Sequence, residues 1–336
     1  MINVAINGFG RIGRAVFKAL LEKKNINIVA INDLTDTAAL AHLLQYDSCY
    51  GKYGKKVGAA KEAIVVNGKK YKVTAIKDPA ALPWKELKVD VVIESTGRFT
   101  DKESAGFHLK AGAKKVIISA PAKDDSVKTI VLGVNEKDFK KSDKIVSMAS
   151  CTTNCLAPLT EVIRANFGIR KAIMSTTHSY TADQNLVDGP HKDLRRARAA
   201  ALNIVPTTTG AAIAVTRAIP QLKNKFDGLA VRVPTPVGSL CDTVFLTGKK
   251  VDEKTVNEAV KKAARDPRLK GILVATEEPI VSSDIVGNPA SSIVDLSITK
   301  VVDGDMLKIV SWYDNEWGYS NRLADLCEFI WRKRLV

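Results

Sequence analysis

The chain has 336 residues, of which 46% are hydrophobic and 26% are charged, and it carries 51 Lys and Arg against 36 Asp and Glu. The length predicts about two domains, and this ordinary share of apolar residues excludes a largely disordered chain. The net charge of +15 leaves nucleic acid, a membrane surface or an anionic substrate open as partners.

Cysteine content and hydropathy indicate the compartment. No stretch approaches the roughly 18 consecutive apolar residues of a membrane span, so no membrane association is expected. The first residues have a strand pattern and not that of a cleaved secretion signal. The five cysteines are odd in number and widely spaced, which does not indicate a disulfide framework. We therefore expect a cytoplasmic protein with reduced thiols.

The first half of the chain alternates β-rich and helical segments. This alternation predicts βαβ units and a parallel sheet. The sequence Asn67-Gly68, between β-rich residues 64–66 and 71–73, predicts an antiparallel hairpin within this domain. The predicted strands are residues 2–6, 26–31, 89–94 and 115–119, and the predicted helices are residues 11–24, 37–45 and 102–111.

After about Met148 the pattern changes, and strands and helices become segregated. Such segregation predicts an α+β domain with a mostly antiparallel sheet. The chain closes with a predicted helix at residues 320–334. The predicted strands of this half are residues 172–177, 228–233, 241–247, 293–298 and 306–312, and its helices are residues 154–167 and 251–264.

A glycine motif joins the first predicted strand to the first predicted helix. Gly8 would permit the tight turn, Gly10 the approach of a diphosphate, and Gly13 close packing of helix on strand. The diphosphate would lie at the helix N-terminus, which favours anions. Asp33, after the second strand, would bind the ribose hydroxyls of NAD and repel the extra phosphate of NADP. We predict a Rossmann-type, doubly wound parallel sheet; the alternative is a glycine turn in another α/β protein.

The sequence Ser150-Cys151-Thr152-Thr153-Asn154-Cys155 follows an apolar run and precedes a helical pattern. Cys151 would then stand near a helix N-terminus, whose positive dipole end lowers the pKa of a thiol. Cys155, one helical turn further, is interpreted as a small buried residue. A zinc site is not expected, because no further ligands stand at suitable spacing.

A catalytic thiol requires a base, and the chain has four histidines. His42 and His108 lie in helical patterns and are interpreted as surface or packing residues. His191 lies in a basic loop. His178 ends the strand predicted at residues 172–177, so it is the preferred base.

These residues resemble one family, the phosphorylating, glycolytic type of glyceraldehyde-3-phosphate dehydrogenase. The resemblance implies oxidation of glyceraldehyde 3-phosphate to 1,3-bisphosphoglycerate, with reduction of NAD, through a thiohemiacetal and a thioester on Cys151. His178 would act as the base, and the family implies a homotetramer. The matching segments, spread in order over nearly the whole chain, are residues 7–14, 149–158, 178–181, 193–201, 206–212, 232–236 and 312–316.

The resemblance also implies binding residues. Among them, Thr181, Arg196 and Arg232 would hold the substrate's C3 phosphate, and Asn315 would orient the nicotinamide carboxamide. The implied cofactor residues are Gly8, Gly10, Arg11, Ile12, Gly13, Asp33, Lys77, Ser119 and Asn315. The remaining implied phosphate residues are Ser150, Thr152, Thr153, Thr209 and Gly210. Residues 1–150 would form the NAD-binding domain, joined again by a C-terminal helix at about 318–336, and residues 151–317 would form the catalytic domain.

Two alternative functions stay open. Erythrose-4-phosphate dehydrogenase would share the cysteine and histidine but hydrolyse the thioester, and the phosphate-site residues argue against it. A basic nucleic-acid-binding protein would cluster its positive charges, whereas the lysine pairs here are scattered, so no specific nucleic-acid binding is expected. The sequence departs from the family pattern at Ile213, at residues 237–241 and at residues 331–334. The resemblance therefore does not predict the side-chain packing and subunit contacts there.

Overall fold

The computed structural model describes residues 1–336 and divides into two compact units. The first unit comprises residues 1–130, 137–149 and 320–336. The second unit comprises residues 131–136 and 150–319. None of the helices is both long enough and apolar enough to span a membrane.

A nine-stranded sheet forms the centre of the first unit, with the order β10-β11-β9-β8-β1-β2-β7-β6-β5. Its strands are β1 (Ile2–Asn7), β2 (Ile26–Asn32), β5 (Val57–Ala60), β6 (Ala63–Val66), β7 (Lys69–Thr74), β8 (Val91–Glu94), β9 (Lys115–Ile118), β10 (Lys128–Thr129) and β11 (Ile145–Ser147). The helices are α1 (Arg11–Leu21), α2 (Thr37–Gln45), α3 (Lys102–Lys110) and the short η1 (Pro79–Ala81) and η2 (Glu136–Asp138), and a separate ribbon pairs β3 (Tyr46–Asp47) with β4 (Gly51–Lys52).

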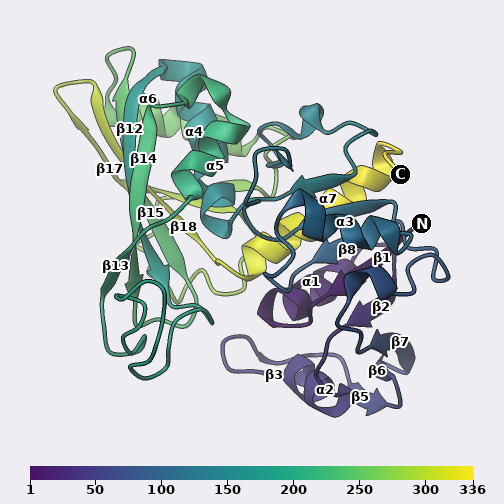
Figure 1. The fold of residues 1–336 in the computed structure, drawn as a ribbon. Helices are drawn as coiled ribbons and strands as arrows, with labels where there is room; N and C mark the ends of the chain where they lie inside the picture. Colours follow the sequence, from purple (N-terminus) through teal and green to yellow (C-terminus); the bar gives the residue numbers. More distant parts are fainter. The chain divides into compact units, whose positions relative to one another are not determined.

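The central strands of this sheet are parallel. Strand β1 pairs in parallel with β2 on one side and with β8 on the other, and β8 pairs in parallel with β9. Every residue of β8 and β9 is buried, as expected for parallel strands covered on both faces. The chain therefore reverses its direction of progress across the sheet at β1, which confirms the predicted doubly wound architecture (Figure 1).

The predicted hairpin is confirmed. Strands β6 and β7 pair antiparallel, with Val66 opposite Lys69. The two turn residues, Asn67 and Gly68, both have positive φ, at 48° and 83°, as a two-residue type I′ turn requires. Because β7 also pairs in parallel with β2, the hairpin extends the main sheet.

The C-terminal helix α7 (Trp317–Arg332) places residues from 320 onward in the first unit. Figure 1 shows α7 in yellow beside the elements of this unit. Lys23, just after α1, forms ion pairs with Asp325 and with Glu328, the latter at 3.1 Å. The end of the chain is thus attached to its beginning.

A seven-stranded sheet forms the second unit, in the order β13-β14-β12-β15-β18-β17-β16. Four of its neighbouring pairs are antiparallel and two are parallel, which confirms a mostly antiparallel sheet. Its strands are β12 (Ile169–Ser179), β13 (Val205–Thr207), β14 (Phe226–Val233), β15 (Ser239–Thr247), β16 (Leu273–Thr276), β17 (Ser292–Val302) and β18 (Met306–Tyr313). The helices are α4 (Cys151–Phe167), α5 (Ala211–Ala218), α6 (Glu253–Ala264) and the short η3 (Pro220–Leu222).

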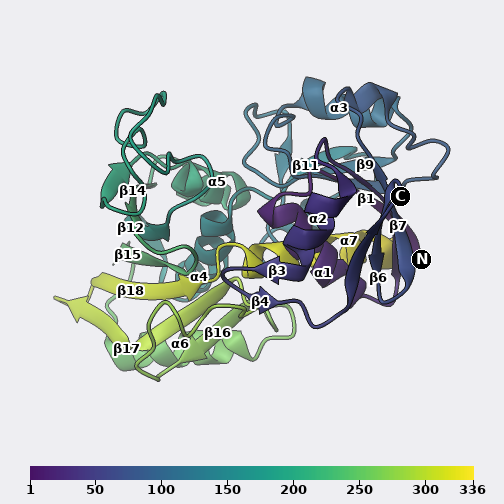
Figure 2. The ribbon, with the colours of Figure 1, turned by 90° about the horizontal axis from the view of Figure 1, so that it is seen from below.

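One face of this sheet is covered and the other is open. Helices α4, α5 and α6 lie on the same face, as the two views agree (Figures 1 and 2). Along β15, buried and partly exposed residues alternate, with Cys241 and Phe245 fully buried. On the open face, apolar side chains such as Ile173, Leu229 and Met306 are 62%, 45% and 44% exposed.

Apart from α2, the predicted helices have boundaries that differ from the observed ones by one to three residues. Helix α1 ends at Leu21, three residues before the predicted end at 24. Helix α4 begins at Cys151 and not at Asn154, because the Ser150 side chain accepts a hydrogen bond from the Thr153 N–H and caps the helix. The short α5, β13 and β16 were not predicted.

Candidate active site

The first turn of α4 places Cys151 at the N-terminal residue of the helix. Ala149, two residues before Cys151, has φ 54°, in the left-handed region that a non-glycine residue rarely adopts. Ser150, in an extended conformation, is the N-cap. This turn starts the helix at the position that the sequence analysis assigned to the nucleophile.

His178 faces the Cys151 thiol. Its Nε2 atom lies 3.5 Å from Cys151 Sγ. Its Nδ1 atom lies 2.7 Å from the Ser179 carbonyl oxygen, which can only accept, so we assign the ring proton to Nδ1. Nε2 is then the nitrogen that can accept a proton from the thiol.

Burial favours the uncharged forms of both groups. It raises the pKa of the Cys151 thiol to about 11, and the positive charge of Arg232 acts in the opposite direction. Burial and Arg232 together lower the pKa of His178 to about 4. The helix N-terminus was expected to lower the pKa of Cys151, but burial has the larger effect and raises it. Both groups are therefore favoured in their neutral forms, with the thiol beside the unprotonated Nε2 atom of His178.

Tyr313 supports this pair and was not assigned a role from the sequence. Its buried hydroxyl lies 2.8 Å from Thr152 Oγ1 and 2.9 Å from Thr176 Oγ1. Its ring packs edge-on against the His178 ring, with centroids 5.9 Å apart. Tyr313 of β18 thus connects α4 and β12 next to Cys151 and His178. The sequence could not reveal these contacts, because they depend on how the strands pair.

A cluster of charged and hydroxyl side chains lies beside His178. Strands β12 and β14 pair in parallel with His178 opposite Arg232. Arg232 donates from Nη1 to Thr181 Oγ1 at 2.7 Å and to the Ser179 carbonyl at 3.2 Å. Its Nε atom is buried without a partner. The structure therefore brings the predicted residues Thr181 and Arg232 together.

Arg196 joins this cluster through a residue that the sequence analysis missed. Arg196 Nη1 donates to Asp183 Oδ2 at 2.6 Å, and the Thr181 hydroxyl donates to the other oxygen of the same carboxylate. Arg196 Nε also donates to Thr207 Oγ1 at 2.9 Å. The pKa of Asp183 is lowered, because these hydrogen bonds and the charges of both arginines outweigh its burial. The sequence signal that could have identified Asp183 was its position two residues after Thr181.

A second group of predicted phosphate residues gathers where α4 and α5 begin. Ser150 Oγ and Thr153 Oγ1 lie 2.8 Å apart, and Thr153 Oγ1 lies 3.4 Å from the Ala211 carbonyl. Thr209 Oγ1 accepts from the Ala211 N–H, and Gly210 is the N-cap of α5 with no side-chain cap. Two helix N-termini, which favour anions, thus converge with three hydroxyls.

Two other predicted residues of the second unit, Thr152 and Asn315, form hydrogen bonds outside this group of phosphate residues. The Thr152 hydroxyl bonds Tyr313 and so does not join the Ser150–Thr153 group. Asn315 Oδ1 accepts from Ser179 Oγ, the Gly238 N–H and Ser239 Oγ at 3.0–3.1 Å. The Asn315 amide is thereby oriented, with Nδ2 as its donor group.

The glycine motif of the first unit has the predicted geometry. Gly8 has φ 92°, and a Cβ atom on Gly13 would lie 2.1 Å from the Gly8 carbonyl oxygen. A Cβ atom on Gly10 would meet nothing within 4 Å. Gly10 is also the N-cap of α1, which has neither a side-chain cap nor an acidic residue in its first turn. This open, positively polarised turn fits the diphosphate of a dinucleotide.

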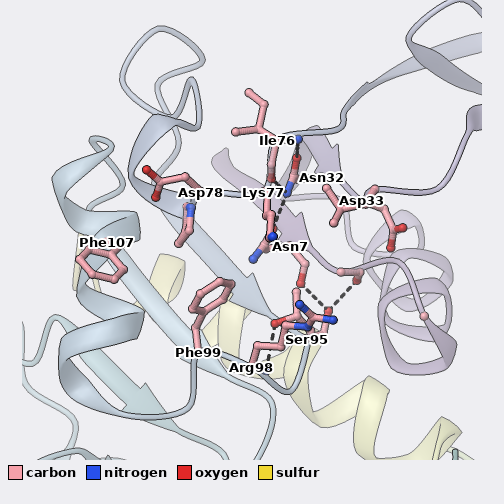
Figure 3. Close-up of a pocket in the computed structure, with 15 residues that line it drawn as sticks. Asn7, Asn32, Asp33, Ile76, Lys77, Asp78, Ser95, Arg98, Phe99 and Phe107 are labelled. Atoms are coloured by element: carbon pink, nitrogen blue, oxygen red, sulfur yellow. Dashed lines mark hydrogen bonds between the residues drawn. The ribbon is translucent and has the colours of Figure 1, made fainter.

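A pocket of about 790 Å³ lies at the carboxyl ends of the parallel strands. Of the predicted cofactor residues, Gly8, Gly10, Asp33 and Lys77 line it. Figure 3 shows Phe99 and Phe107 on the opposite side of the pocket from Asp33. The sequence analysis did not assign the other lining residues, which are Asn7, Asn32, Leu34, Ile76, Asp78, Pro79, Ser95, Thr96, Arg98, Phe99 and Phe107.

Asp33 is also engaged with the glycine turn. Its Oδ2 accepts from the Phe9 N–H at 2.7 Å and its Oδ1 from the Thr35 N–H at 3.0 Å. Arg11 and Ile12 lie in the first turn of α1, outside the pocket lining. Ser119 follows β9 and donates its N–H to the Glu94 carbonyl.

Comparison with known proteins agrees with both halves of the chain. Residues 2–102 match the family model described as glyceraldehyde 3-phosphate dehydrogenase, NAD binding domain, and residues 150–315 match the C-terminal domain of the same family. A glyceraldehyde-3-phosphate dehydrogenase of Streptomyces coelicolor is 56% identical over 331 residues, or 98% of each chain. Those of Geobacillus stearothermophilus and Mycobacterium tuberculosis are 55% and 58% identical over 99% and 98% of each chain.

Proposed function

Since the chain belongs to the glyceraldehyde-3-phosphate dehydrogenase family, we propose that Cys151 and His178 carry out its reaction, the NAD-dependent oxidation of glyceraldehyde 3-phosphate in glycolysis. The observation that carries this assignment is the 3.5 Å approach of Cys151 Sγ to His178 Nε2. His108 instead faces Trp84 and Glu94, and His191 faces the backbone of Asp193.

Cys151 acts as the nucleophile in this proposal. Its Sγ attacks the aldehyde carbon while His178 Nε2 accepts the thiol proton, which gives a thiohemiacetal. Since Nδ1 donates to the Ser179 carbonyl, the protonated ring is held with Nε2–H directed at the sulfur and at the oxygen formed there. This donor stabilises the developing oxyanion.

The first unit supplies the cofactor site. NAD, when bound, accepts the hydride released as the thiohemiacetal becomes a thioester. The open turn at Gly10 and the N-terminus of α1 fit its diphosphate, and Asp33 fits the ribose hydroxyls. Asn315, oriented through its Oδ1, would hold the carboxamide.

Two anion sites complete the proposal. Arg232 and Thr181, with Arg196, bind the C3 phosphate, and the buried, unpartnered Nε of Arg232 supports this role. Ser150, Thr153, Thr209 and Gly210 bind inorganic phosphate, which attacks the thioester and releases 1,3-bisphosphoglycerate. The thioester preserves the energy of oxidation for this transfer.

We further propose a homotetramer in the cytoplasm. Support for association comes from the open sheet face with Ile173 and Met306, and from the exposed Leu194 and Leu202 of the loop between β12 and β13. Cys151, Cys155, Cys241 and Cys327 are free thiols, which fits a reducing compartment. Light scattering after size exclusion is expected to give four chains, and a monomer would refute the assembly.

The formation of NADH tests the proposed function. With glyceraldehyde 3-phosphate and NAD, turnover should require inorganic phosphate or arsenate. Turnover that is equally fast without either anion would indicate hydrolysis of the thioester and favour erythrose 4-phosphate as the substrate. Absence of NADH formation with both aldehydes would refute the proposal.

A further inference from the structure

We propose that Glu94 and His108 are positioning residues for NAD binding, acting through a buried hydrogen-bond network beneath the cofactor pocket. This inference rests on the proposed function. The network also contains Trp84, Asn7 and Asn32. His108, Trp84 and Glu94 are at most 1% exposed, so of the two alternatives predicted for His108, a surface or a packing residue, the structure shows the buried one.

Glu94 is the centre of the network. Its Oε2 accepts from Asn7 Nδ2 at 2.6 Å and faces His108 Nε2 at 2.9 Å. Its Oε1 accepts from the Thr96 N–H at 2.8 Å and from the Thr96 hydroxyl. Four donors converge on two oxygens, which is the bonding pattern of a carboxylate. No lysine or arginine pairs with Glu94, so its side-chain partners are Asn7, Thr96 and His108.

Trp84 determines which nitrogen of His108 carries the proton. The indole Nε1–H lies 3.0 Å from His108 Nδ1 and can only donate. Nδ1 must therefore accept, which leaves the ring proton on Nε2, facing Glu94. A doubly protonated ring would set an N–H against the Trp84 N–H. This tautomer satisfies both neighbours of the His108 ring, Trp84 and Glu94.

From Glu94 the network continues across the ends of the parallel strands. Asn7 Oδ1 accepts from Asn32 Nδ2 at 2.8 Å, and the same Nδ2 donates to the Ile76 carbonyl at 2.9 Å. Asn32 Oδ1 accepts from the Ile76 N–H and from Thr74 Oγ1, both at 2.9 Å. The carboxyl ends of β8, β1, β2 and β7 are therefore joined in one row.

Each of these strand ends leads into a segment that lines the pocket. Thr96 follows β8, Gly8 follows Asn7, Asp33 follows Asn32, and Lys77 follows Ile76. Figure 3 shows Asn7 and Asn32 in the middle of these segments. His108 and Trp84 do not line the pocket. His108 reaches it through the network and through an edge-on contact of its ring with Phe99, which does line it. Fixing four segments in advance reduces the ordering cost of binding.

The test is direct titration of the whole protein with NAD by calorimetry, without substrate. His108→Leu removes both the donor to Glu94 and the acceptor for Trp84. We expect its Kd for NAD to rise about tenfold, equivalent to about 1.4 kcal/mol. In the NAD-free protein, amide hydrogen exchange should accelerate at residues 32–34, 76–78 and 95–98. The KM for glyceraldehyde 3-phosphate should stay unchanged.

Two gentler variants and one control separate positioning from general destabilisation. His108→Gln can donate to Glu94 and accept from Trp84, so its affinity for NAD should be largely restored. Trp84→Phe removes the donor that fixes the tautomer, together with part of a fully buried ring, and should have an intermediate effect on the affinity for NAD. Lys115→Met alters another buried polar residue of the same unit, whose Nζ bonds two backbone carbonyls away from the pocket; it should lose stability but bind NAD normally.

The outcomes are distinguishable from failure of the proposed function. If the unaltered protein binds NAD and forms NADH, but His108→Leu binds NAD with the same Kd, the network has no positioning role. The same conclusion follows if Lys115→Met loses as much affinity as His108→Leu. If the unaltered protein does not bind NAD, the proposed function fails and this inference fails with it.

Discussion

Helices α1 and α4 each begin beside a binding site, but their first turns differ. Helix α1 follows Gly10, with no side chain capping it, and offers backbone to an anion. Helix α4 follows Ser150, which caps it, and offers the side chain of Cys151. The first site depends on the absence of Cβ atoms, whereas the second depends on particular functional groups. Substitutions should therefore act on the first site by steric conflict and on the second by loss of chemistry.

The largest effect should come from the nucleophile. Cys151→Ser should lower kcat/KM by about 10⁴-fold or more, because a hydroxyl is a far weaker nucleophile beside a neutral imidazole. Cys155→Ala is the matched control, since Cys155 is buried one turn further along the same helix and does not face His178. Cys155→Ala should retain a kcat/KM within a few fold of that of the unaltered protein. Undiminished activity of Cys151→Ser would end the covalent mechanism.

Loss of the base should cost less. His178→Asn should lower kcat by about 10²–10⁴-fold, the usual contribution of a general base. The KM for NAD should be unaffected, because the cofactor pocket consists of residues of the first unit. Rates of NADH formation over a range of NAD concentrations give both parameters. A variant with full kcat would remove His178 from the mechanism.

The buried histidine also makes stability depend on pH. Its pKa is about 4 in the folded protein, against about 6.5 when unfolded. Above pH 6.5 the His178 ring is neutral in both the folded and the unfolded state, so its lowered pKa does not affect stability. As the pH falls from 6.5 to 4, only the unfolded state takes up this proton, so stability falls by up to about 3 kcal/mol. Urea unfolding at several pH values should show a smaller loss in His178→Asn; equal losses would contradict the assigned pKa.

The same change, to alanine, should reduce stability at Gly13 of the first site but not at Gly10. In Gly13→Ala the new Cβ would lie 2.1 Å from a backbone oxygen, which should reduce stability by about 1–3 kcal/mol. In Gly10→Ala the Cβ meets nothing within 4 Å, so stability should stay close to that of the unaltered protein. Thermal unfolding of both variants makes the comparison. Equal stabilities would refute the close packing at Gly13.

The smallest effect concerns the choice of cofactor. We expect kcat/KM to favour NAD over NADP by at least about tenfold, or about 1.4 kcal/mol. Asp33→Asn removes the charge but retains an oxygen that can accept from the Phe9 N–H, so the glycine turn should persist. The ratio of kcat/KM for NAD to that for NADP should decrease. Kinetics with both cofactors measure it. An unchanged ratio would show that the Asp33 charge does not discriminate.

The two sites also differ in how far the sequence predicts them. The glycine motif could be predicted because its spacing along a strand, turn and helix is local. The opposition of His178 and Arg232 could not, because it depends on the register of β12 against β14. Tyr313 and Asp183 were missed for the same reason, since their partners are distant in sequence or belong to an irregular loop. The sequence left His108 open as a surface or a packing residue, because a helical pattern does not reveal a buried partner such as Glu94.

The central claim is that a thioester on Cys151 links oxidation to phosphorylation. The most direct measurement is rapid mixing of the protein with glyceraldehyde 3-phosphate and NAD in the absence of phosphate. We predict a burst of NADH stoichiometric with the chain, followed by a slow phase that accelerates when phosphate is added. A steady phosphate-independent rate with no burst, or a burst of the same size in Cys151→Ser, would contradict the account.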